Sequence, residues 1–102
     1  MFSWYDMNSD QRYLTVDIER RGYGRRYTWL PVDQLSHSNF LIDCTGGYIK
    51  PEMIDIRRDD TVRWREGERL IEAYVTEVVR EDRTLHVRMD GAHPLPPEAF
   101  YP

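Results

Sequence analysis

Residues 19–27, with the sequence ERRGYGRRY, carry the side chains of this chain that are best suited to hold an anion. The arginine guanidinium is a planar cation that binds phosphate or carboxylate through paired hydrogen bonds, and a tyrosine ring can stack on a nucleobase. The glycines between the arginines would let the protein backbone approach a ligand closely. We therefore expect this stretch to contact a nucleic acid or an acidic protein surface. The candidate contact residues are Arg20, Arg21, Tyr23, Arg25, Arg26 and Tyr27.

The charge of the whole chain keeps a second interpretation open. The net charge is -4 and the isoelectric point is about 5.3, which argues against broad, non-specific binding of nucleic acid. A charged hairpin tip also keeps an exposed sheet edge soluble. Residues 59–98 hold ten acidic residues and six arginines. The alternative function is therefore an inhibitor or adaptor that binds a protein and no nucleic acid, either a phage-type inhibitor or an acidic mimic of DNA.

Residues that could catalyse a reaction or hold a metal are scattered along the chain. Cys44 follows His37 by seven positions and has Asp43 beside it, but it lies in an apolar run, where a thiol is usually buried and inert. His86 and His93 are seven positions apart, which matches no common zinc spacing. We expect a protein that is not an enzyme, with no catalytic residue, no metal site and no cofactor.

The composition also bears on the compartment. No stretch approaches the roughly 18 consecutive apolar residues of a membrane span, and the first residues, MFSWYDMNSD, do not resemble a signal peptide. The single cysteine allows no internal disulfide. We expect a cytoplasmic protein that does not contact a membrane. Its first aromatic residues either pack on the body or contact a partner or a second copy, so the oligomeric state, a homodimer included, stays open.

The candidate contact stretch lies between two expected strands. Residues 13–20 alternate between polar and apolar side chains, which indicates a half-buried strand, and residues 25–30 resume the pattern after two glycines. We expect a β-hairpin over residues 13–30 with the arginines at its tip. A compact apolar strand follows at residues 40–44. Acidic pairs such as Asp59-Asp60 fall in expected turns between arginines, which predicts solvated side chains.

Residues 70–79, LIEAYVTEVV, fit two structures. Their apolar side chains form a stripe at helical spacing, but their β-branched residues and the alternating run at 84–89 favour a strand. We expect a second hairpin with its turn at residues 80–83. Short 3₁₀ turns are expected near residues 31–36 and 96–100, where prolines prevent regular strand pairing. The expected core comprises Leu14, Val16, Ile18, Trp29, Leu41, Ile42, Val62, Trp64, Ile71, Val75, Leu85 and Val87.

Residues 59–100 resemble an SH3-like small barrel of the Tudor type. The order of features carries the resemblance: a strand with Trp64, a turn, the long run AYVTEV, a charged turn at 80–83, and a strand that closes in Asp90-Gly91. The resemblance is at the level of the fold, and it implies binding rather than catalysis. It also makes Trp64 and Tyr74 candidate walls of an aromatic groove.

The expected fold is all-β, or a β-rich α+β fold, in a single domain of residues 1–102. Two architectures fit the strands: a compact SH3-like barrel, or two packed β-hairpin units with short 3₁₀ turns. The second is suggested because both halves read strand, charged turn, strand, and then Leu-Pro before a short turn. The two units would be residues 1–50 and 51–102.

Overall fold

The computed structural model of the chain describes residues 14–96, and all of its regular structure except one 3₁₀ turn is β-strand. The all-β fold class is therefore confirmed. The elements in chain order are β1 (Thr15–Arg20), β2 (Gly24–Pro31), β3 (Gln34–Leu35), β4 (Asn39–Asp43), the 3₁₀ turn η2 (Pro51–Met53), β5 (Thr61–Glu66), β6 (Arg69–Arg80) and β7 (Thr84–Pro94).

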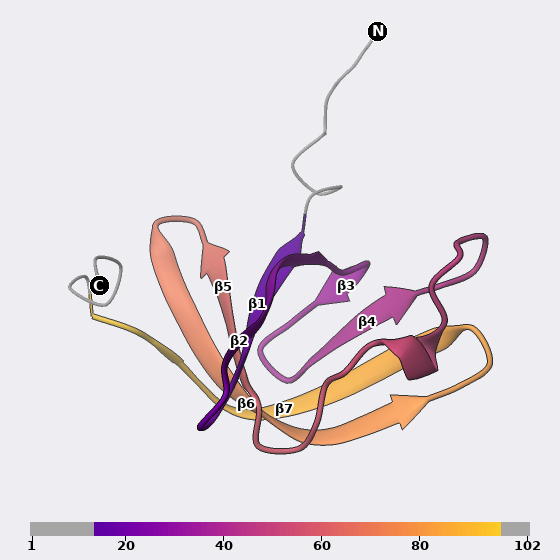
Figure 1. Ribbon diagram of the computed structural model, residues 1–102. Coiled ribbons are helices and arrows are strands. Elements are labelled where there is room, and N and C mark those ends of the chain that lie inside the picture. The colour runs from indigo at the N-terminus through magenta and orange to yellow at the C-terminus, as the bar shows by residue number, and fades with distance from the viewer. Residues whose placement is uncertain (1–13, 97–102) are drawn as a thin grey trace, which may run out of the picture.

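The strands form one antiparallel sheet in the order β2-β1-β5-β6-β7-β4-β3, curled into a half-barrel (Figure 1). Strands β6 and β7 are long and run through the bend. Their ladder carries register shifts between Glu72 and Tyr74 and between Val75 and Glu77. Because such bulges increase local twist and bend a strand, they explain why the sheet curls at this place.

Both expected hairpins are present. Strands β1 and β2 pair around a tip at residues 21–23, where Gly22 and Gly24 have φ angles of 82° and 83° that glycine adopts without strain. Residues 69–80 form strand β6 rather than a helix, and they pair with β7. The strand interpretation of residues 70–79 is therefore confirmed.

The core is built by alternation of buried and more exposed residues along β1, β4, β5 and β7, whereas β6 buries Ile71, Glu72 and Ala73 in a row. Its largest buried side chains include Ile18, Phe40 and Leu85, none of which is more than 1% exposed. Trp64 and Met89 are also buried, at 4% and 5%. The strand pattern therefore predicted most of the core, since every second residue faces it. The placement of Leu41 in the core is wrong, because Leu41 is only half-buried, between the buried Phe40 and Ile42 of β4.

The placement of Trp29 in the core is wrong, because its side chain is 74% exposed. Val16 pairs with Leu30 and Ile18 pairs with Tyr27, so both Thr28 and Trp29 stand opposite the single residue between those partners. At this bulge Trp29 takes a φ of 57°, and its N–H donates to the Asp17 carboxylate at 2.8 Å. The extra residue therefore turns the indole out of the core.

The prediction of a 3₁₀ turn near residues 31–36 is also wrong. Pro31 ends strand β2, and Gln34 and Leu35 pair with β4 as the two-residue strand β3. The one described 3₁₀ turn begins at Pro51, whose fixed φ suits the first position of a turn. The turn expected at 96–100 falls almost wholly outside the described residues.

Replacing Trp29 with glycine should leave the free energy of unfolding unchanged or raise it by up to about 1 kcal/mol, because glycine relieves the left-handed backbone and the exposed indole contributes little packing. Trp64→Ala, the matched change at a buried tryptophan, should cost about 3–5 kcal/mol. Urea unfolding followed by circular dichroism measures both. A decrease above about 2 kcal/mol for Trp29→Gly would contradict the exposed, strained placement.

Candidate nucleic-acid interface

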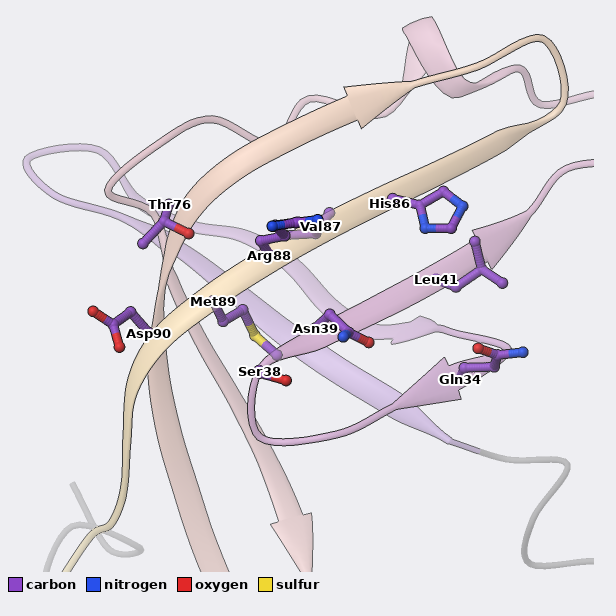
Figure 2. A pocket seen from close by; sticks show the side chains of 10 residues that line it. All are labelled: Gln34, Ser38, Asn39, Leu41, Thr76, His86, Val87, Arg88, Met89 and Asp90. Carbon is purple, nitrogen blue, oxygen red and sulfur yellow. The ribbon is translucent and has the colours of Figure 1, made fainter.

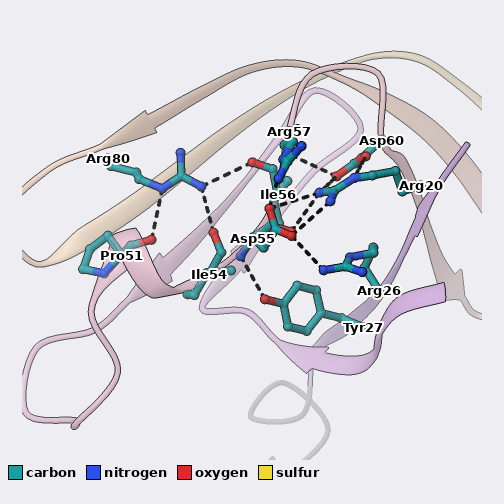
Figure 3. A network of polar contacts seen from close by, with 10 residues as sticks. All are labelled: Arg20, Arg26, Tyr27, Pro51, Ile54, Asp55, Ile56, Arg57, Asp60 and Arg80. Carbon is teal, nitrogen blue, oxygen red and sulfur yellow. Dashed lines mark hydrogen bonds and ion pairs between the residues drawn. The ribbon is translucent and has the colours of Figure 1, made fainter. Parts of the chain in front are cut away.

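Arg20, at the end of β1, is held between two carboxylates under the hairpin tip (Figure 3). Its Nε and Nη2 donate to the two oxygens of Asp60, each at 3.0 Å, and its Nη1 donates to Asp55 at 3.0 Å. The Asp60 side chain is only 2% exposed and that of Arg20 is 11% exposed. The prediction of a solvated side chain is therefore wrong for Asp60, because a buried arginine pairs with it.

Asp55 collects three arginines from different parts of the chain. Besides Arg20, it accepts hydrogen bonds from Arg26 at 2.8 Å and from Arg57 at 3.1 Å. Its backbone N–H donates to the Tyr27 hydroxyl at 2.8 Å. These contacts fasten strand β2 to the segment that precedes β5 (Figure 3).

A second arginine holds the same segment from the other side. The Arg80 guanidinium, at the end of β6, donates to the backbone carbonyls of Pro51, Ile54 and Ile56 at 3.1, 2.7 and 3.3 Å. Carbonyl oxygens without a sheet partner are thereby satisfied. Residues 51–58 are therefore held largely by side chains, whereas Asp59 and Asp60 also exchange backbone hydrogen bonds with Val75 of β6.

The ionic contacts shift the pKa values of the groups that make them. Hydrogen bonds to Asp60 and then to Asp55 raise the pKa of Arg20. The pKa of Asp55 is lowered, chiefly by the hydrogen bond from Arg20, with further contributions from Arg26 and Arg57. Both shifts favour the charged forms, so the cluster is an ion-pair network at neutral pH.

The six predicted contact residues separate into two groups. Arg20, Arg26 and Tyr27 belong to the network beneath the tip. Arg21 and Tyr23 lie at the exposed tip, and the Tyr23 side chain is 77% exposed.

Arg25, the remaining predicted contact residue, is also exposed. Its nearest acidic oxygen, on Asp17, is 3.5 Å away, and that contact is exposed. Within residues 14–96, Arg21 has no ion-pair partner. The tip therefore presents cationic side chains in addition to those that the network uses.

Further arginines join the tip from distant parts of the chain. Arg57 and Arg58 line one hollow together with Arg20 and Arg21, and a second hollow together with Arg80 and Arg88 of β7. In the described part of the chain, Arg58 also lacks an ion-pair partner. We call Arg21, Arg57, Arg58 and Arg88 the arginine face.

Of the arginine face, only Arg21 was expected from the sequence. Arg57-Arg58 reach the tip because β1 pairs with β5, which follows them in the chain. Arg88 stands on a strand expected to be charged on its outer side. A run of two arginines before Asp59-Asp60 was the one local signal.

A polar hollow adjoins the arginine face at Arg88, which lines both (Figure 2). Asn39 and Leu41 of β4, Gln34 of β3 and His86 of β7 border it. Amide, imidazole and guanidinium groups can each hydrogen-bond to base edges or sugars. The hollow therefore offers hydrogen-bonding groups next to the cationic ones.

The two aromatic residues expected to form a groove lie on opposite faces of the sheet. Trp64 is buried in the core, with its ring centroid 6.1 Å from that of His37. Tyr74 is 40% exposed on the outer face and covers Gly91, where an added Cβ would lie 3.2 Å from the ring. The two rings therefore do not line a common groove.

Tyr74 belongs instead to a polar cluster around Glu72, a residue only 8% exposed. Glu72 accepts hydrogen bonds from Arg63 at 2.7 Å and from Tyr74 at 2.8 Å, and His93 Nε2 is 3.3 Å away. Burial acts to raise the pKa of Glu72, but the hydrogen bonds from Arg63 and Tyr74 outweigh it and lower that pKa. The cluster fastens β5, β6 and β7 to one another.

The residues considered for catalysis lie apart. The His37 ring contacts Glu66 at 2.9 Å, whereas Cys44 lies at the end of β4. Burial and the carboxylates of Asp43, Asp33 and Glu52 raise the pKa of the Cys44 thiol, which makes it a weaker nucleophile. Among residues 14–96 no group of three or more His, Cys, Asp or Glu side chains could hold a metal ion. No helix in the same residues is long and apolar enough to span a membrane.

Replacing Asp60 with alanine should lower the free energy of unfolding by about 3 kcal/mol or more, because it leaves Arg20 buried with half of its partners. The control is Asp82→Ala, because the Asp82 side chain is 97% exposed. This change should alter the free energy of unfolding by less than about 0.5 kcal/mol. Denaturant titration of the two variants measures the difference. Equal stabilities would show that the Arg20 network contributes nothing to folding.

Acid should destabilise the protein through Asp55 and Glu72. Their ordinary pKa values are 3.8 and 4.5, and both are lowered in the folded state. Their stabilisation is therefore complete above the ordinary values and is lost as pH falls through the lowered ones. Asp55→Asn should flatten the pH dependence of the unfolding free energy below about pH 4. An unchanged slope in Asp55→Asn would contradict the ion-pair assignment.

Comparison of the chain with protein-family models, with curated proteins and with solved structures found no match. The curled sheet itself is compatible with a small β-barrel fold.

Proposed function

We propose that this protein is a non-enzymatic binding protein of the SH3-like, Tudor-type barrel class that contacts nucleic acid through its arginine face. The observation that carries the proposal is the convergence of arginines from the hairpin tip, the 57–58 turn and β7 on two hollows that share Arg57 and Arg58. Phosphate groups are ligands that such a group of guanidinium cations binds through paired, charge-assisted hydrogen bonds.

The balance of charge at the face supports an anionic ligand. The two carboxylates under the tip, Asp55 and Asp60, already accept hydrogen bonds from Arg20, Arg26 and Arg57. Arg21 and Arg58 add two cations that have no acidic partner among the described residues. Asp59 and Glu77 also line the two hollows, and Glu77 pairs with Arg88 at 3.5 Å. Arginines still outnumber carboxylates in the lining, so this surface carries a local positive charge although the chain as a whole is acidic.

The exposure of Tyr23 favours single-stranded nucleic acid as the ligand. Tyr23 is 77% exposed at the hairpin tip and stands between two glycines, where an added Cβ would meet nothing within 4 Å. A base that is not paired in a duplex can stack on such a ring. The adjacent polar hollow at Asn39 and His86 could hydrogen-bond to neighbouring nucleotides.

The network beneath the tip supports a rigid surface. Arg20 holds the end of β1 to Asp55 and Asp60, on either side of the 57–58 turn. Tip and turn are therefore held together before any ligand arrives. A surface arranged in advance loses less conformational entropy on binding.

The double variant Arg21→Gln/Arg58→Gln should weaken binding and reduce the salt dependence of binding by about two in the slope of log K against log salt, roughly one for each phosphate that is no longer neutralised. Fluorescence anisotropy of labelled single-stranded RNA and DNA, titrated at several salt concentrations, measures both quantities. The matched control, Arg69→Gln/Arg83→Gln, removes the same charge at exposed positions outside the arginine face and should leave the slope unchanged.

Absence of binding at low salt would overturn the proposal, and equal effects of the two double variants would reduce it to non-specific electrostatic attraction. Binding of an acidic protein with no nucleic acid bound would favour the adaptor or inhibitor alternative instead.

Tyr23→Ala should weaken the binding of single-stranded probes by about 1–3 kcal/mol, with a much smaller effect on duplex probes, because only unpaired bases can stack on the ring. The same anisotropy titration with matched single-stranded and duplex oligonucleotides measures the contrast. Equal weakening for both probes would show that the tyrosine does not stack on bases.

A further inference from the structure

A groove of about 720 Å³ lies at the seam of the half-barrel, between β2 and β4. We call it the seam groove. Its charge differs from that of the arginine face, because no lysine or arginine is among the described residues that line it. Its apolar lining comprises Tyr27, Leu30, Ile42, Tyr48, Ile49 and Met53.

Three of these side chains are far more exposed than apolar side chains usually are. Tyr48 is 100% exposed, Ile49 57% and Met53 63%. Met53 lies on the segment that Arg80 holds through the carbonyls of Pro51 and Ile54, and Tyr48 and Ile49 shortly precede that segment. Clustered apolar exposure of this kind is typical of a protein interaction site.

The seam also leaves one strand edge open. Strand β2 is the last strand at one end of the sheet, so its outer edge has no strand partner in the described residues. The edge of β4 is occupied, because the Asp33 N–H donates to the Leu41 carbonyl and the Asp43 N–H donates to the Asp33 carboxylate. An extended chain can pair with an open edge of this kind.

Two carboxylates make the groove negatively charged. Asp33 and Asp43 both line it, and within the described residues neither takes part in an ion pair. Asp43 instead accepts a hydrogen bond from the Thr45 N–H at 2.9 Å. The raised pKa of the neighbouring Cys44 thiol, due first to burial and then to these carboxylates, reports the same negative field. Nucleic acid would be repelled here, whereas a cationic side chain would be attracted.

We propose that the seam groove binds an extended segment of another protein that places an apolar side chain among Tyr48, Ile49 and Met53 and a lysine or arginine against Asp33 and Asp43. The two surfaces of the chain then take partners of opposite charge. The molecule would connect a nucleic acid to a basic-apolar protein segment, yet the groove does not depend on nucleic-acid binding.

Cys44 provides a built-in reporter, because it lines the groove and is the single cysteine of the chain. A bound segment should slow its reaction with a small thiol reagent. The probe is a displayed library of short random peptides, selected on the immobilised full-length chain. We expect enriched peptides to combine aliphatic or aromatic residues with lysine or arginine and to protect Cys44 from the reagent.

Two variants test the chemistry of the groove without touching the core. Tyr48→Ser/Ile49→Ser removes exposed apolar side chains, and Asp33→Asn/Asp43→Asn removes charge while keeping an acceptor oxygen at each position. Each should weaken the selected peptides at least tenfold. The control Glu68→Gln/Glu77→Gln, at exposed positions that line neither the seam groove nor the hollow beside it, should leave affinity unchanged, and Tyr23→Ala should do the same.

Several results would overturn the proposal: no enriched peptide, enrichment of acidic peptides, or binding that neither protects Cys44 nor responds to the groove variants. Protection of Cys44 in the protein alone would also overturn it. If that protection rose with protein concentration, a second copy would be the occupant, and if it did not, the chain itself would be.

Discussion

The contact on which most of this structure depends is the pairing of Arg20 with Asp60 and Asp55. One guanidinium, only 11% exposed, satisfies the nearly buried Asp60 and reaches across to the segment before β5. Burying charges is costly unless their hydrogen bonds are complete, and here Asp60 also accepts the Arg57 N–H at 2.9 Å. This arrangement positions residues 55–60 and with them the turn of the arginine face, while Arg80 holds residues 51–56, which form one wall of the seam groove.

Local sequence patterns predicted the strands well, because alternation of polar and apolar residues has the period of a strand. The hairpin at residues 13–30 and the strand at 70–79 could be predicted in this way. Trp29 could not, since its outward position depends on a bulge that Asp17 stabilises from the neighbouring strand. The local sequence pattern does not show where a β-bulge will change the face to which a side chain points.

The candidate site was only partly predictable for a related reason. The tip residues Arg21 and Tyr23 are neighbours in the sequence and stay neighbours in the fold. Arg20, in the same run, turns inward because a buried carboxylate 40 residues away requires a partner. Arg58 and Arg88 join the tip through strand pairing that no local pattern encodes. Which arginine is a ligand group and which is a structural ion therefore depends on contacts distant in the chain.

The order of strands in the sheet has a consequence for synthesis on the ribosome. The centre of the sheet is the consecutive meander β5, β6 and β7, whereas β1 pairs with β5 and β4 pairs with β7. Strands β1 and β4 are therefore synthesised before the central strands with which they pair. Until then their open edges can pair with other chains, so this domain completes its sheet only when residues up to the end of β7 have left the exit tunnel.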